Sequence, residues 1–344
     1  MTSGPHRISL SGIEPRFKSE SGSLQQVSAS ELGLLSRISI KRLLLAPGSI
    51  REPHWHANAD ELTYCLSGEL LVSVLGDGDD FSSFRITAGQ MFHVTSGAIH
   101  HIENIGQAEA ELILAFSHES PEDFSMHAAY GAMSDAVLGN TYDLPSAAFA
   151  GIDRDTRPAY LLPRSGKPEL PAGIDLENPA RFDVEAQAAP IDTPAGQAKL
   201  ARKQFWPALR SLSMYSLRVT PEGMREPHWH PETSERGYVV SGRARMTIMD
   251  PDGTTDTYEL SAGDVYFVPP AYPHHIEDIG SDAFHFLVFF DQPTPRDIGY
   301  RATGSAYSRE VLAATLGVEP DELPELPFTP VDPLIVRRDN PLDG

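Results

Sequence analysis

Short apolar runs separated by turn-forming residues dominate the first half of the chain. They lie at 38–45, 62–66, 70–75, 84–86, 91–94 and 111–116. Dipeptides such as Pro47-Gly48 and Ala88-Gly89 separate them, and such pairs are typical of tight turns. Many short strands at this spacing predict an antiparallel sandwich or barrel.

The second half shows the same pattern. Its apolar runs lie at 213–219, 238–240, 244–249, 257–260, 265–268 and 284–290. After each series the pattern becomes typical of a helix, at 132–140 and again at 306–314, where Ser134 returns as Ser308. The chain is therefore predicted to be all-β, with two barrels in tandem that are each followed by a short helical tail.

A repeated motif relates the two halves. The sequence Arg51-Glu52-Pro53-His54-Trp55-His56 recurs unchanged at 225–230, a displacement of 174 residues. Glu61 and His100 have counterparts at the same displacement, Glu235 and His274. A fixed displacement over such a long stretch indicates that one module is present twice.

Length and proline content suggest the domain boundaries. With 344 residues the chain has the length of two domains, since one domain takes roughly 150 residues. Residues 1–36 are predicted to form an N-terminal arm, and residues 37–165 the first domain. The stretch 158–194 carries seven prolines and no sustained periodicity, which is typical of a linker. We therefore expect the second domain, with its lead-in linker, to cover 166–344.

Charge and cysteine content disfavour several classes of partner. A formal net charge of -21 argues against nucleic acid and an anionic membrane surface, because both bind basic patches. Cys65 is the only cysteine, so no internal disulfide can form, and we expect it to be buried in a strand. The serine-rich N-terminus lacks a secretory pattern, and no stretch approaches the ~18 apolar residues of a membrane span. These features predict a cytoplasmic protein.

The repeated histidines and glutamates have the composition of a metal site. His54 and His56 lie two positions apart, so both rings point to the same face of a strand. Glu61 follows after a short bend and His100 lies on a later strand, so the four side chains can converge inside a barrel. Six of the 13 histidines occupy the same three positions of the two modules, which favours ligands over ordinary core residues.

The second module repeats this set as His228, His230, Glu235 and His274. Three imidazoles and one carboxylate leave two positions of an octahedron open, and such a mixed nitrogen and oxygen set suits Mn or Fe(II). A catalytic zinc site with three histidines remains an alternative. We expect two metal ions per chain.

These residues resemble the motifs of a known family. The first cupin motif is matched by His54-x-His56, Glu61 and Gly68, and the second by His100 and the residues around it. Residues 222–280 match both motifs again. The resemblance covers nearly the whole chain and implies a bicupin, with two double-stranded β-helix (jelly-roll) barrels. An arginine three residues before the first ligand, at Arg51 and Arg225, is similar to that of the oxalate decarboxylase group.

The resemblance implies an activity. Members of that group are metal-dependent carboxy-lyases that use Mn(II) and dioxygen to convert oxalate to formate and CO2, and they assemble as stacked trimers in a hexamer. Arg51 and Arg225 would grip a substrate carboxylate through two parallel hydrogen bonds. The alternative for both arginines is an ion pair with a structural glutamate such as Glu52 or Glu226.

The sequence departs from the group at the residues that would transfer a proton. In the oxalate decarboxylases a lid of sequence Ser-Glu-Asn-Ser-Thr supplies the acid/base glutamate of the first domain. The stretch 116–125 does not match it, so Glu119 and Glu122 are candidates, with solvated surface charges as the alternative. The glutamate of the family's second domain aligns with Val288, so we expect turnover in the first module.

Three other functions stay open. Oxalate oxidase would produce CO2 and hydrogen peroxide from the same substrate. An Fe-dependent dioxygenase would act on another small carboxylic acid. A storage or ligand-binding bicupin would have no turnover, but it would not need all eight metal-ligand positions.

Overall fold

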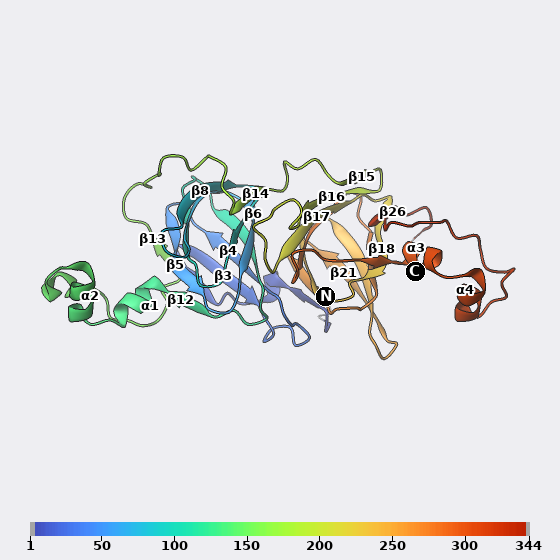
Figure 1. Ribbon diagram of the computed structural model, residues 1–344, viewed down its shortest axis with the longest axis horizontal. Helices are drawn as coiled ribbons and strands as arrows, with labels where there is room; N and C mark the ends of the chain where they lie inside the picture. Colours follow the sequence, from blue (N-terminus) through green and yellow to red (C-terminus); the bar gives the residue numbers. More distant parts are fainter. Residues whose placement is uncertain (1–3, 342–344) are drawn as a thin grey trace.

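The computed structural model describes residues 4–341 and contains two β-barrels side by side (Figure 1). Each barrel is made of two antiparallel sheets, with strand orders β14-β9-β6-β11-β4-β3-β2 and β12-β5-β10-β7-β8 in the first. The second has β1-β22-β19-β24-β17-β16-β15 and β21-β20-β23-β18-β25, while β13 and β26 add to β5 and β18. The predicted all-β tandem of barrels is confirmed.

The strands of the first barrel are β2 (Phe17–Ser19), β3 (Gly22–Val27), β4 (Ser39–Leu45), β5 (Ser49–His56), β6 (Glu61–Ser67), β7 (Glu69–Leu75), β8 (Phe81–Thr87), β9 (Gln90–Val94), β10 (Ile99–Asn104), β11 (Ala110–Phe116), β12 (Asp123–Ser125), β13 (Leu161–Pro163) and β14 (Arg181–Asp183). Every predicted run of this half lies in one of them, except that β4 begins one residue after the start of the run 38–45. The turn between β6 and β7 needs Gly68, whose φ is 102° and whose added Cβ would lie 2.4 Å from Ala110 Cβ.

The strands of the second barrel are β1 (Arg7–Ser9), β15 (Ile191–Thr193), β16 (Gly196–Ala201), β17 (Ser213–Val219), β18 (Gly223–Trp229), β19 (Glu235–Ser241), β20 (Arg243–Met249), β21 (Thr255–Ser261), β22 (Asp264–Val268), β23 (His274–Asp278), β24 (Phe284–Phe290), β25 (Ile298–Gly299) and β26 (Ile335–Arg337). The predicted runs of the second half again fall within strands.

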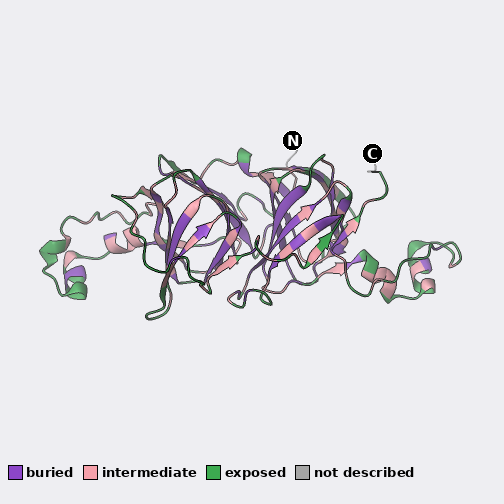
Figure 2. Cartoon of the chain, turned by 90° about the horizontal axis from the view of Figure 1, so that it is seen from above, coloured by how far each residue is buried: buried purple, intermediate pink, exposed green. Residues whose placement is uncertain are grey.

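The first barrel is followed by α1 (Met126–Gly131), α2 (Asp135–Tyr142) and the 3-10 turn η2 (Ser146–Phe149), and the second by α3 (Tyr300–Ala306) and α4 (Arg309–Leu316). Another 3-10 turn, η1 (Leu10–Gly12), lies between β1 and β2. Ser134 and Ser308 cap α2 and α4 by accepting a hydrogen bond from a backbone N–H three residues later. The helices extend away from the barrels at opposite ends; α2 and α4 are largely exposed, whereas α1 and α3 are mostly half-buried (Figure 2). Among residues 4–341, no helix is long and apolar enough to cross a membrane.

The segments that precede the two barrels are exchanged between them. β1, which precedes the first barrel, pairs with β22 of the second, whereas β14, which precedes the second, pairs with β9 of the first. A buried ion pair of 2.7 Å between Arg7 and Asp264 accompanies the first exchange. The two halves are therefore interlocked. The boundary expected at residue 166 stays a prediction.

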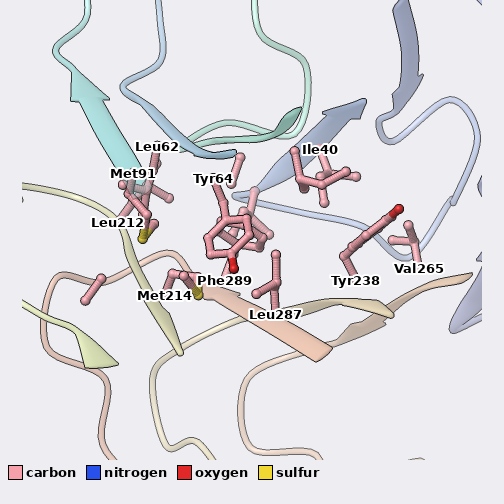
Figure 3. Packing of buried hydrophobic residues seen from close by; sticks show 14 of the residues in the cluster. Ile40, Leu62, Tyr64, Met91, Leu212, Met214, Tyr238, Val265, Leu287 and Phe289 are labelled. Carbon is pink, nitrogen blue, oxygen red and sulfur yellow. The ribbon is translucent and has the colours of Figure 1, made fainter. Parts of the chain in front are cut away.

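A hydrophobic cluster joins the two barrels (Figure 3). It combines side chains of the first half, such as Leu62 and Met91, with those of the second, such as Met214 and Phe289. Leu10, from the N-terminal segment predicted to be an arm, is buried in the same cluster. Cys65 is fully buried in β6, as expected. Each barrel also has its own hydrophobic cluster, which includes Phe84 and Leu112 in the first barrel and Met246 and Phe286 in the second.

Candidate metal centres

In the first barrel, three strands bring the predicted ligands together. β5 carries His54 and His56, β6 begins with Glu61, and β10 carries His100 directly opposite His54. All four side chains are buried, and one potential ligand atom from each lies within 4.8 Å of the others.

The second barrel repeats this geometry with His228, His230, Glu235 and His274, whose ligand atoms also lie within 4.8 Å of one another. The ring centroids of His228 and His274 are 4.1 Å apart, as are those of His54 and His100 in the first barrel. The repeat in the sequence is therefore also a repeat of the site.

Hydrogen bonds fix which nitrogen of each histidine carries the proton. Four rings direct Nδ1 at a backbone carbonyl two residues earlier, at distances between 2.7 and 3.1 Å: His54, His100, His228 and His274. A carbonyl oxygen can only accept, so Nδ1 must be the donor. In the neutral ring, Nε2 then offers its lone pair to the barrel interior, as a metal ligand must.

Nδ1 of His56 has a carboxylate in place of the carbonyl, whereas Nδ1 of His230 has a carboxylate in addition to the Arg296 carbonyl, which lies 3.1 Å away. Nδ1 of His56 lies 2.8 Å from Asp123 Oδ1, and Nδ1 of His230 lies 2.6 Å from Asp297 Oδ1. Carboxylates in this position orient metal-binding histidines and raise their basicity. The sequence analysis gave neither aspartate a role. The sequence could have indicated this role, because Asp123 and Asp297 are separated by 174 residues, the same displacement that relates the two ligand sets.

The inward-facing atoms fit a cation. His56 Nε2 lies 2.9 Å from Glu61 Oε2, and His100 Nε2 lies 3.4 Å from the same oxygen. Burial lowers the pKa of His54 well below its usual value, and the charge of Arg51 adds to this effect. A neutral imidazole and a carboxylate both present lone pairs, so they repel unless a cation lies between them. The donor set therefore suits a divalent metal ion.

A β-bulge aims Arg51 at the same site. Residues three apart on a regular strand face opposite sides of a sheet. Here His54 pairs with His100 while Arg51 pairs with Ile102, so β5 uses three positions where β10 uses two. The extra residue turns Arg51 to the side of His54. In β18 the same register shift separates Arg225 from His228.

The two arginines pair with the aspartates that orient the histidines. Arg51 Nη2 donates to Asp123 Oδ2 at 3.2 Å, whereas its shortest distance to Glu52 is 3.9 Å. Arg225 Nη2 donates to Asp297 Oδ2 at 2.8 Å. Both guanidinium groups are almost completely buried, so each is fixed beside the ligand set.

The two sites differ in the residues around this common frame. In the first, the Lys41 ammonium group donates to both oxygens of Asp123, at 2.9 and 2.8 Å. Tyr215 stands at the corresponding position of the second site, 174 residues later. The first site therefore holds one more buried positive charge.

The two loop glutamates lie outside the ligand sets. Glu119 accepts a hydrogen bond from the backbone N–H of Arg37 at 2.9 Å. The Glu122 side chain is exposed and lines a surface hollow of about 530 Å³ together with Arg16 and Glu31. Its backbone is close to the site, because its carbonyl accepts a hydrogen bond from Ala57, the residue after His56. Their catalytic role stays a prediction.

Comparison with known families identifies the repeat. The family model described as "Cupin" matches residues 8–148 and 184–323, so both barrels are covered. Each matched segment contains one of the two candidate metal-ligand sets.

Two oxalate decarboxylases are similar to most of this chain, and an oxalate oxidase is similar to about a quarter of it. The oxalate decarboxylase OxdC of Bacillus subtilis is 29% identical over 303 residues, which cover 85% of this chain and 77% of the relative. An oxalate decarboxylase of Arthroderma benhamiae is 22% identical, with 89% and 78% covered. The oxalate oxidase GF-2.8 of Triticum aestivum is 34% identical over 87 residues, which are 24% of this chain and 39% of the relative.

Solved structures show the same fold. A variant of Bacillus subtilis OxdC superimposes with a TM-score of 0.86 over 98% of this chain and 90% of the other, at 24% identity. A second structure of this decarboxylase, determined to assign the spectroscopic parameters of its Mn(II) centres, gives a TM-score of 0.85 at 24% identity, with the same coverage.

Proposed function

The chain belongs to the cupin family as a bicupin, and we propose that it is a Mn(II)-dependent, oxalate decarboxylase-like enzyme that converts oxalate to formate and CO2. The observation that carries the proposal is the placement of Arg51. Its buried guanidinium lies on the same side of β5 as the ligand set, which suits a small dicarboxylate bound between metal and arginine. The similarity to oxalate decarboxylases of two organisms supports this substrate class.

We propose two Mn(II) ions per chain, held by the three histidines and one glutamate of each barrel, with Fe(II) as the other candidate. The Mn(II) centres of the Bacillus subtilis relative support this choice. A bound Mn(II) would supply a Lewis acid and a one-electron redox partner. Removing His54 and His56 together should lower the metal content by one equivalent per chain.

The chain's own residues then bind and orient the substrate. Arg51 binds one carboxylate of oxalate. Because the guanidinium already donates a hydrogen bond to Asp123, this bond must weaken or break when oxalate binds. Lys41 keeps Asp123 anchored during the exchange, because it bonds both of the aspartate's oxygens. Asp123 in turn continues to hold His56. Arg225 and Asp297 provide the corresponding pair in the second barrel.

Decarboxylation requires a proton donor, because oxalate dianion plus one proton gives formate and CO2. Asp123 does not suit this role, since Lys41, with His56 and Arg51, holds its pKa far below the usual value despite its burial. Glu122 and Glu119 are the carboxyl groups that we propose for proton transfer. Their side chains must move to act, so residues 117–122 would serve as a lid.

Oxalate oxidase is the second candidate function. Because Glu119 bonds the Arg37 backbone and the Glu122 side chain is exposed, the intermediate could instead be oxidised, so that oxalate, dioxygen and two protons yield two CO2 and hydrogen peroxide. The partial similarity to a wheat oxalate oxidase favours the same alternative. The other two alternatives are an iron dioxygenase acting on another acid and a storage bicupin. Neither is favoured by a specific observation on the described residues.

One assay separates these functions. Protein loaded with Mn(II) is supplied with oxalate and dioxygen, and formate and hydrogen peroxide are measured in the same reaction. We expect formate to dominate. Dominant peroxide would replace decarboxylase by oxidase, and the absence of both products would leave a binding or storage protein.

We also propose that the chain forms a homo-oligomer, a trimer or a hexamer. The helical tails expose large apolar side chains that a monomer would leave in water, among them Tyr142, Leu144, Leu316 and Phe328. Light scattering on the purified protein should give three or six chains per particle. A monomer at micromolar concentration would contradict the proposal.

A further inference from the structure

A third group of potential metal ligands lies outside both barrels' centres. It consists of His6, Asp250 and Asp256, and one potential ligand atom from each lies within 4.8 Å of the others. His6 precedes β1, so it belongs to the exchanged segment that lies against the second barrel (Figure 1). Asp250 follows β20, and Asp256 lies on β21. The group therefore lies where the exchanged segment meets the hairpin of β20 and β21.

The exchanged segment holds His6 in one orientation. The Phe267 backbone N–H donates to the His6 carbonyl at 2.8 Å, and His6 Nδ1 lies 3.0 Å from the Phe267 carbonyl. The His6 side chain is completely buried. Since a carbonyl only accepts, Nδ1 carries the proton, and Nε2 of the neutral ring presents a lone pair.

This lone pair faces a carboxylate, as in the two barrel centres. His6 Nε2 lies 3.4 Å from Asp250 Oδ1, close to the 3.4 Å between His100 Nε2 and Glu61 Oε2. Two acceptors at this distance repel unless a proton or a metal ion lies between them. A neutral His6 with two aspartates carries a charge of about -2, which a divalent ion cancels and a single proton does not.

The hairpin is built to hold the two aspartates. Asp250 and Thr254 pair through their backbones across the turn, with a 2.9 Å bond from the Asp250 N–H. Asp256 and Tyr258 are two positions apart on β21, so their side chains share a face. Among residues 4–341, the buried Tyr258 hydroxyl has no hydrogen-bond partner of good geometry. Burial and the neighbouring Asp256 and Asp250 raise the pKa of Tyr258 to about 12.

The group is not part of the repeat. The residues 174 positions away from its three members are Ala180, Gly76 and Ser82, which offer no comparable ligand set. The first barrel therefore has no equivalent, and the ligands belong to the contact between β1's segment and the second barrel.

We propose that His6, Asp250 and Asp256 form a third, structural site for a divalent cation, which clamps the exchanged N-terminal segment onto the second barrel. One imidazole and two carboxylates are a ligand set that suits Zn²⁺ or Mn²⁺, with water in the remaining positions. A cation bound only by the folded chain stabilises it, so this site would strengthen the interlock between the halves.

Metal analysis of four proteins tests the site. The wild type, His6→Gln, Asp256→Asn and Asp252→Asn are produced with added Zn²⁺ or Mn²⁺ and freed of loosely bound metal by gel filtration. Asp252 is a matched control, because it lies in the same hairpin, caps Thr254 and carries the same charge. We expect His6→Gln and Asp256→Asn each to contain one metal equivalent less than the wild type and the control.

We expect this loss of one metal equivalent to occur whether or not the two barrel centres are intact. Combining Asp256→Asn with removal of His54 and His56 should therefore take away one equivalent beyond the double histidine variant. We also expect added Zn²⁺ to raise the melting temperature of chelator-treated wild type more than that of either variant. Equal metal contents in all four proteins would overturn the proposal and leave an ion pair of protonated His6 with Asp250. The Asp256→Asn arm keeps the test valid if His6→Gln fails to fold.

Discussion

The Tyr266 hydroxyl donates a 2.7 Å hydrogen bond to Glu235 Oε1, and the tyrosine ring occupies the space that Gly237 leaves open. A Cβ at position 237 would lie 1.9 Å from the tyrosine ring. In the first barrel, Thr63 stands at the position of Gly237 and donates a 2.7 Å hydrogen bond to Glu61 Oε1. The two barrels thus orient the same ligand carboxylate with hydroxyl groups from different strands.

This relationship predicts site-specific losses of metal affinity. Tyr266→Phe removes the hydroxyl that holds Glu235, so the second centre should bind metal about 10- to 100-fold more weakly. Thr63→Val should do the same to the first centre. Each affinity is measured by competition with a chelator, in chains whose other barrel centre has been removed. Equal affinities in variant and parent would mean that the hydroxyl groups do not tune the metal.

Substituting Arg51 should show whether this residue binds the substrate or has only a structural role. Arg51→Lys keeps the charge but loses the two-pronged grip, so kcat/KM for oxalate should fall about 30-fold, which corresponds to ~2 kcal/mol. Arg225→Lys is the matched control in the second barrel, and we expect it to leave kcat/KM unchanged. Metal content should stay at the wild-type level in both. A fall in metal content that parallels the fall in activity would give Arg51 a structural role.

The sequence predicted which side chains converge in each barrel, because the features that indicate them are local or repeated. The alternation of His54 and His56 on one strand and the displacement to the second module were both readable. The bulge that turns Arg51 toward the ligands was not, since it depends on how β5 pairs with β10. The role of Asp123 was missed although it recurs as Asp297, because a lone aspartate after a strand has many other functions.

Long-range pairing was the main feature that the sequence did not predict. β1 and β14 contain three residues each, too few for a periodicity to stand out. Their partners lie in the other half of the chain, where only tertiary structure brings them together. Tyr266 and Gly237 illustrate the same limit, because the space that one leaves is filled from a neighbouring strand.

A buried histidine far from the metal centres predicts a loss of stability at low pH. Burial, with the nearby Arg218, lowers the pKa of His285 to about 4 from its usual 6.5. The unfolded chain therefore binds this proton first, and stability should fall as pH drops from 6.5 toward 4. His285 should contribute roughly 1 to 3 kcal/mol of this loss.

Urea unfolding of metal-loaded protein at several pH values checks this. His285→Gln should flatten the decline between pH 6.5 and 4, and His127→Gln on α1 serves as the control. The hydrogen bond between His285 and Ser216, 3.0 Å long, is also lost, so the variant should be less stable at pH 7. Identical pH slopes in wild type and His285→Gln would contradict the prediction.

The last prediction is that turnover belongs mainly to the first barrel. The segment after β11 carries Glu119 and Glu122, whereas the corresponding positions after β24 are Pro293 and Arg296. Proline stiffens a segment that a lid would need to move, and arginine cannot act as a general acid at neutral pH. Val288, at the position where the family resemblance leads us to expect a glutamate in the second domain, is buried in the second barrel and cannot transfer a proton.

A pair of substitutions tests this assignment. Glu119→Gln combined with Glu122→Gln should lower formate production by ~10^2-fold or more, within the range for general acid catalysis. Glu235→Gln weakens the second metal centre, so it should lower the melting temperature more than the rate. If Glu235→Gln abolishes turnover in a fully folded protein while the loop variant stays active, the chemistry takes place in the second barrel. A loop variant with less formate and more hydrogen peroxide would instead identify these carboxyl groups as what keeps the enzyme a decarboxylase, because without a proton donor the intermediate is oxidised.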